Sequence, residues 1–109
     1  SSANKKLDQG NTKTAIALYK KALSVNRKKG TKAMLGLGWS YLDIGKNRDA
    51  EKYFKMAKGA NPRIGESYWG LAEVYGAMKK APLKKLMCRE YLRVSPKGPE
   101  ASMARRCSK

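Results

Sequence analysis

Histidine is absent from this sequence, and acidic residues are scarce. The eight aspartates and glutamates are dispersed, and none stands beside an obvious acid or base partner. Without histidine the commonest general base is missing. The sequence also lacks a glycine-rich phosphate loop and a nucleophile elbow. We therefore predict that the protein is not an enzyme, and we expect no cofactor and no metal site.

Long apolar runs and cysteines are also few. No run approaches the roughly 18 apolar residues that a membrane-spanning helix needs, and no signal-peptide apolar segment is present. The two cysteines, Cys88 and Cys107, fall in expected helices without the spacing of metal ligands. This usage fits a thiol-reducing compartment best, so we expect a cytoplasmic location, while a single disulfide remains open.

Positive charge is the strongest compositional feature. Twenty-five lysines and arginines stand against eight acidic residues, which gives a net charge of +17. Such an imbalance favours anionic partners, namely an acidic protein, nucleic acid or an acidic membrane surface. Hydrophobic residues make up 41% of the 109 residues, which is enough for a continuous core if the elements are helical.

A period of 34 residues organises the chain. Residues 31–62 have the pattern of two amphipathic helices joined by a turn at Gly45, and neither helix could bury its apolar face alone. The following residues are paired one period apart: Leu37 with Leu71, Gly38 with Ala72, Tyr41 with Tyr75, and Pro62 with Pro96. A fixed period with small, aromatic and proline residues in register predicts a stacked repeat array.

The central copy resembles a tetratricopeptide repeat. That repeat has the pattern W-x2-L-G-x2-Y, then A-x3-F, then P. The chain carries it as Met34-x2-Leu37-Gly38-x2-Tyr41, Ala50-x3-Phe54 and Pro62, with Met34 in the place of the tryptophan. The resemblance implies an all-α fold: a right-handed α-solenoid of stacked antiparallel helix pairs, with a C-terminal capping helix.

We expect one domain of about three repeats, and a fragment of a larger protein because the sequence opens in the middle of the pattern. The expected parts are repeat 1 at about 1–30 (truncated at its start), repeat 2 at about 31–64, repeat 3 at about 65–98 and a cap helix at about 99–107. In repeat 1 we expect a turn at Gly10-Asn11 and a helix over residues 12–25. The core residues expected in that helix are Ala15, Tyr19 and Ala22, which match Ala50, Phe54 and Ala57.

The second helix of repeat 3 departs from the pattern. Lys84 and Cys88 stand where Ala50 and Phe54 stand one period earlier. We therefore expect this helix to pack through a rotated face. The residues of that face are Leu83, Leu86, Met87 and Leu92.

The resemblance places the first helix of each repeat on a concave inner surface. The residues expected in this groove are Asn4, Leu7, Lys32, Leu35, Trp39, Leu42, Asp43, Glu66, Trp69 and Glu73. Large apolar side chains on an exposed concave face mark a binding site, although each tryptophan could instead be packing between helices. Some related domains hold a terminal carboxylate with basic groove residues, but Gly36, Glu66 and Gly70 stand at those positions here. The groove therefore suits a peptide or helical segment of another protein.

Basic residues concentrate on the second helices, which the resemblance places on the convex side. The predicted basic surface comprises Lys20, Lys21, Arg48, Lys52, Lys55, Lys58, Lys84, Lys85 and Arg89. It is either a solvated outer face or a contact surface for an anionic partner. We therefore predict a scaffold or adaptor that binds a partner protein of acidic character. The alternative is a basic module on nucleic acid or acidic membrane, and we also expect some self-association through the truncated repeat end.

Overall fold

The computed structural model describes the backbone of residues 2–25 and 30–109, and the side chains of residues 10–25 and 30–109. The described part of the chain is helical and contains no strand. The helices are α1 (Ser2–Val25), α2 (Thr31–Asp43), α3 (Asn47–Ala60), α4 (Gly65–Ala77), α5 (Ala81–Val94) and α6 (Ala101–Cys107). Within these residues no helix is both long enough and apolar enough to cross a membrane.

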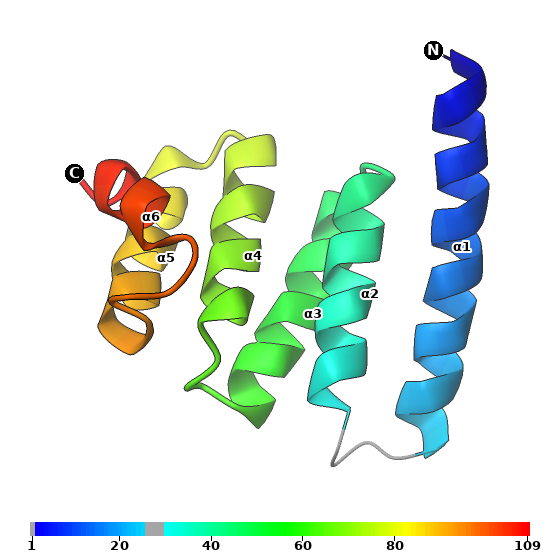
Figure 1. Cartoon of the computed structure of the whole chain (residues 1–109), viewed down its shortest axis with the longest axis horizontal. Coiled ribbons are helices and arrows are strands. Elements are labelled where there is room, and N and C mark those ends of the chain that lie inside the picture. The colour runs from blue at the N-terminus through cyan, green and yellow to red at the C-terminus, as the bar shows by residue number, and fades with distance from the viewer. Residues whose placement is uncertain (1, 26–29) are drawn as a thin grey trace.

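The helices stack side by side, from α1 at one end of the molecule to α6 at the other (Figure 1). Helix α2 packs on α3 and α4 packs on α5, as two hairpins, and α3 in turn contacts α4. Helices α1 and α6 pack on the two ends of this arrangement. The predicted all-α, solenoid-like stack of helix pairs is confirmed.

The two hairpins turn in the same way, although their turn residues differ. Gly45 has a φ of +79°, and Lys79, one period later, has a φ of +58°. The next amide donates back across the turn in both, from Lys46 N to the Tyr41 carbonyl (2.9 Å) and from Lys80 N to the Tyr75 carbonyl (2.8 Å). This is the bond that closes a helix ending in a left-handed residue. The lysine therefore adopts a backbone conformation that favours glycine.

Phe54 is the centre of the core. It comes from α3 and is fully buried between α2 and α4. A Cβ atom built on Gly38 or Gly70 would lie 2.7 Å or 2.3 Å from the Phe54 ring. Both glycines are therefore needed, because they let the ring lie against the backbones of two neighbouring first helices.

A polar contact joins α3 to α4 beside this core. The Tyr75 hydroxyl donates a hydrogen bond to the Glu51 carboxylate, and Lys55 Nζ lies 3.3 Å from Glu51 Oε2. The bond from Tyr75, with help from Lys55, lowers the pKa of Glu51. Burial and the same hydrogen bond raise the pKa of Tyr75.

Helix α1 corrects the predicted start of the domain. It continues through Gly10-Asn11, so the prediction of a turn there is wrong. Ile16 and Leu23 are buried, whereas Ala22 is exposed and not in the core as predicted. Ala57, its counterpart in α3, is buried because α3 packs between α2 and α4. Among the described helices, α1 packs closely on α2 only, so Ala22 stays exposed.

Helix α5 corrects a second prediction. Leu83 and Leu86 are exposed, at 39% and 46%, so the rotated face is wrong for these two residues. Cys88 and Tyr91 are buried in the repeat register, and Met87 is buried beside them. The helix therefore keeps the orientation of α3.

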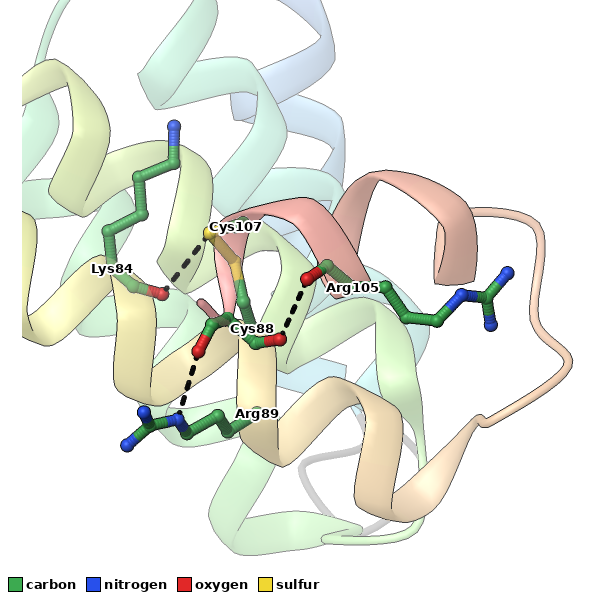
Figure 2. Close-up of a disulfide and its surroundings, with 6 residues drawn as sticks. Lys84, Cys88, Arg89, Arg105 and Cys107 are labelled. Carbon is green, nitrogen blue, oxygen red and sulfur yellow. Dashed lines mark hydrogen bonds between the residues drawn. A yellow bond between two sulfur atoms is a disulfide. The ribbon is translucent and has the colours of Figure 1, made fainter.

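A disulfide between Cys88 and Cys107 ties α6 to α5 (Figure 2). The sequence favoured free thiols and left a disulfide open, and the structure contains the disulfide. Arg89 Nε donates to the Ser108 carbonyl at 3.1 Å, and Ala101 and Ala104 are buried. Glu100 N, at the start of α6, also donates to the Tyr91 hydroxyl of α5 at 3.0 Å. The short helix is thus held by the disulfide, these two hydrogen bonds and a small apolar contact.

Candidate binding groove

Trp39 is an aromatic side chain of α2 that borders open space. It is half-buried, and its indole Nε1 donates a hydrogen bond of 3.2 Å to Glu66 Oε2 on α4. Its ring meets Phe54 edge to face, with centroids 4.9 Å apart and planes at 79°. The indole is therefore fixed by α3 and α4, while part of its surface stays open.

Three cavities meet at Trp39. One of about 450 Å³ lies between α1 and α2, and one of about 590 Å³ continues from there to the start of α4. A third, of about 420 Å³, lies between α4 and the segment that follows α5. Other side chains lining them include Thr12, Ala15, Tyr19, Ser40, Asp43, Ile64, Glu66, Trp69, Ser95 and Pro99. We call these three cavities together the Trp39 groove.

Gly36 lets Tyr19 of α1 lie close to α2 beside the Trp39 groove. A Cβ atom on this residue would lie 2.5 Å from the Tyr19 ring. The tyrosine of α1 therefore lies directly on the backbone of α2, and both residues line the 590 Å³ cavity. The sequence predicted Tyr19 only as a core residue, because it stands at the position of Phe54. In the structure its ring is half-buried and also lines this cavity.

Trp69 differs from Trp39 in its surroundings. Its side chain is only 8% exposed, and its ring contacts Tyr91 at 5.9 Å between centroids. Most of the Trp69 side chain is therefore packed between helices. The sequence left open whether each tryptophan packs in this way or binds a partner. The exposed edge of Trp69 nevertheless lines two cavities, one shared with Trp39 and one beside α6.

Acidic groups lie along the Trp39 groove. Glu66 and Asp43 are exposed, and Thr12 Oγ1 donates to Asp43 Oδ2 at 2.9 Å. Glu100 borders the cavity next to Trp69. Lys32 is the basic residue that lines the same groove. The groove is therefore more acidic than the rest of this strongly basic chain.

The remaining predicted groove residues are placed unequally. Lys32 and Leu35 line the 590 Å³ cavity, although Leu35 is mostly buried, and Leu42 is half-buried against the core. Glu73 lies beside Trp69 in the cavity near α6. The side chains of Asn4 and Leu7 lie outside the described residues. Ser95, Pro99 and Glu100 were not predicted, because nothing in the sequence shows that the segment after α5 turns toward α4.

The predicted basic residues do not share a single environment. Lys20 Nζ lies 5.6 Å from the centre of the Tyr41 ring, and Lys52 Nζ lies 5.4 Å from that of Tyr53. The two tyrosines stack with centroids 5.6 Å apart, so these two lysines bracket an aromatic pair. The exposed residues among the others are Lys21, Arg48, Lys55 and Arg89, and Lys58 is half-buried. Lys84 and Lys85 instead line the cavity beside α6.

Metal ligation has no support in the described residues. They contain no group of three or more aspartate, glutamate, cysteine or histidine side chains that could hold a metal ion. The groove presents an indole, several carboxylates and apolar walls. Such a surface can bind a side chain or a helix from another molecule.

Comparison with known families finds a match over the first part of the chain. The profile described as tetratricopeptide repeat matches residues 6–75, which is more than half of the chain. The match runs from α1 to α4, and therefore includes most of the residues that line the Trp39 groove. No curated protein matches the chain.

Proposed function

The chain belongs to the tetratricopeptide repeat family, whose members are generally protein–protein interaction modules, and on that premise we propose that it is a non-enzymatic scaffold that binds a partner segment in the Trp39 groove. The observation that carries the proposal is that three cavities meet at one half-buried indole. A tryptophan can bury 150–250 Å² on contact and is enriched among residues that dominate binding energy.

The groove also suggests what the bound segment contains. Its apolar walls suit an aliphatic or aromatic side chain, and the carboxylates of Asp43 and Glu66 suit a lysine or arginine beside it. An amphipathic helix laid in a groove presents these groups three or four residues apart. We therefore propose a short peptide or helix that is apolar on one side and carries at least one positive charge toward α2 and α4.

Parts of the partner outside the Trp39 groove would face the positive charge of the rest of the chain. Because the whole chain carries +17, acidic flanks on the partner would accelerate encounter and disfavour basic competitors. The other candidate function, non-specific binding of nucleic acid or acidic membrane, depends on this charge alone. Binding to phosphates falls by about 10³-fold or more between low and moderate salt when several phosphates are contacted. Binding through apolar anchors should fall far less.

Site-specific photocrosslinking tests the proposal. A photoreactive amino acid at Ser40, which lines two of the three cavities, should form a covalent adduct with the partner in the source cell. The matched control carries the same group at Lys55, an exposed residue of α3 outside these cavities. Adducts at Ser40 but not at Lys55 support the groove. Protein or nucleic acid adducts at Lys55 alone would show that the convex side is the contact surface.

A further inference from the structure

A fourth cavity lies beyond Trp69, between α4, α5 and α6. Its volume is about 610 Å³, within the range of about 300–1,000 Å³ typical of ligand sites. The lining residues that matter here are Trp69, Glu73, Lys84, Lys85, Met103 and Arg106. We call it the α6 cavity. It shares the edge of Trp69 with the Trp39 groove but differs from it in charge.

Four basic side chains line the α6 cavity against one acidic side chain. Lys84 and Lys85 are half-buried on α5, and Arg106 on α6 and Lys109 after it line the cavity as exposed residues. Lys84 is held against α4, since a Cβ atom on Gly76 would lie 3.0 Å from Lys84 Nζ. Glu73 is the acidic residue on the opposite wall. A partly desolvated, positively charged recess of this kind attracts an anion more strongly than the same charges in open water.

The rest of the wall is apolar. The edge of Trp69 forms one side, and Met103 on α6 is 49% exposed. Methionine is flexible and adapts to different apolar partners. The cations gather around one recess with an apolar wall and do not follow a track, as a polyphosphate backbone would need.

We propose that the α6 cavity binds an acidic peptide segment, in which an aspartate or glutamate stands next to a large apolar side chain. The carboxylate would lie among Lys84, Lys85 and Arg106, and the apolar side chain against Trp69 and Met103. This inference rests on the proposed function, because it assigns the acidic flank of the partner to a defined place beside the Trp39 groove.

The disulfide holds one wall of this site. Cys107 itself lines the α6 cavity, and its bond to Cys88 fixes α6 on α5 (Figure 2). A helix of seven residues is not stable in isolation. Met103 and Arg106 therefore depend on the attachment of α6, to which the disulfide contributes, whereas Lys84 and Lys85 belong to α5.

The test uses a capped hexapeptide of sequence DELFDE and its neutral counterpart NQLFNQ, with binding measured by calorimetry. We expect DELFDE to bind at least tenfold more tightly than NQLFNQ. We expect Lys85→Gln and Arg106→Gln each to weaken DELFDE about fivefold or more. The matched control is Lys58→Gln, which removes one charge from a half-buried lysine of α3 outside this cavity and should change the affinity less than twofold. An equal loss in Lys58→Gln would overturn the site in favour of diffuse attraction.

Two further arms separate the contributions. Breaking the disulfide by Cys88→Ala with Cys107→Ala should weaken DELFDE about fivefold or more, and Met103→Ser, which keeps the disulfide, should do so where the double variant does not fold. Unchanged binding in the folded double variant, or in Met103→Ser, would contradict a role for α6. An oligothymidylate that competes with DELFDE at equal affinity would assign the cavity to phosphates instead.

Trp39→Ala distinguishes failure of this inference from failure of the proposed function. Trp39 does not line the α6 cavity, so this variant should bind DELFDE normally while losing the partner protein. Normal partner binding by Trp39→Ala would reject the Trp39 groove without affecting the peptide result. Loss of DELFDE binding in folded Trp39→Ala would reject a separate acidic-segment site.

Discussion

At the scale of single residues, glycine has opposite consequences at two helical positions. Gly70 of α4 lies under the Phe54 ring, where an added Cβ would come within 2.3 Å, whereas Gly59 of α3 has nothing within 4 Å. Glycine in a helix is normally about 0.5–1 kcal/mol less favourable than alanine. The sign of a glycine-to-alanine change therefore reports whether the space beside it is needed.

We expect Gly70→Ala to destabilise the protein by about 1–3 kcal/mol, because the buried ring must move. Gly59→Ala should stabilise it by about 0.5 kcal/mol or more. Urea unfolding of both variants measures the difference. Stabilisation by Gly70→Ala would show that Phe54 does not lie against α4.

The hydrogen bond from Tyr75 to Glu51 makes stability depend on pH. The pKa of Glu51 is lowered in the folded protein, so its contribution is present above the unfolded value of about 4.3 and is lost as the pH falls through the folded pKa. Glu51→Gln should therefore be less stable than the unchanged protein at pH 7, and this gap in unfolding free energy should narrow as the pH falls below about 4.3.

Unfolding free energies at several pH values measure this gap. Tyr75→Phe is the matched variant, because the tyrosine hydroxyl is the largest cause of the lowered pKa of Glu51. It should reduce the same pH dependence. A constant gap from pH 7 to pH 3 would contradict the hydrogen bond.

At the scale of helices and turns, the sequence predicted α2 to α4 closely. Their apolar positions repeat at 34 residues, and Gly45 supplies the left-handed residue that a helical turn needs. Glycine also led to the predicted turn at Gly10, but α1 continues through this residue without a break. Glycine permits a turn but does not impose one, since a helix turns back only where a neighbour buries its face.

In the hairpin of α4 and α5, a lysine occupies the left-handed position of the turn, which lowers the stability of the fold. Lys79 adopts a φ of +58°, which is about 1–2 kcal/mol unfavourable for a residue with a Cβ. We expect Lys79→Gly to raise the stability by about 1 kcal/mol, measured as a shift in the melting temperature. Lys79→Ala, which removes the charge but keeps the Cβ, should give little gain. An equal gain from alanine would show that charge, not backbone conformation, is responsible.

The predicted face of α5 was wrong for Leu83 and Leu86, whereas Met87 is buried and Leu92 packs against the core. A lysine at the position of Ala50 suggested that the helix rotates, but the stem of Lys84 lies along Gly76 and carries its charge out to the α6 cavity. Cys88, at the position that Phe54 has in α3, is buried in the core and bonded to Cys107. Neither the pairing of the cysteines nor the path of residues 95–100 has a periodic signal, so neither could be predicted.

At the scale of the whole molecule, one side of α1 exposes large apolar residues. Leu18 is 64% exposed and Val25 is 80% exposed, although both are large apolar residues. An array of repeats buries such faces by adding a neighbour. The self-association expected from the sequence therefore remains a prediction, and this side of α1 is where it would occur.

The candidate groove was predicted in part. Its position on α2 and α4 followed from the resemblance, and Trp39 and Glu66 meet there through a hydrogen bond that the sequence could not show. Trp69, which looked equivalent to Trp39, is mostly buried and packs against Tyr91. Exposure depends on the neighbouring elements, which a repeat pattern does not specify.

The affinity of the crosslinked partner for Trp39→Ala tests the central claim most directly. The claim predicts a loss of about thirty- to a thousand-fold, equal to ~2–4 kcal/mol, with helicity unchanged. The control variant replaces Lys52, Lys55 and Lys58 by alanine, removing charge away from the Trp39 groove, and should lose far less. Normal binding by Trp39→Ala together with a large loss in the lysine variant would contradict the claim and assign binding to the convex surface.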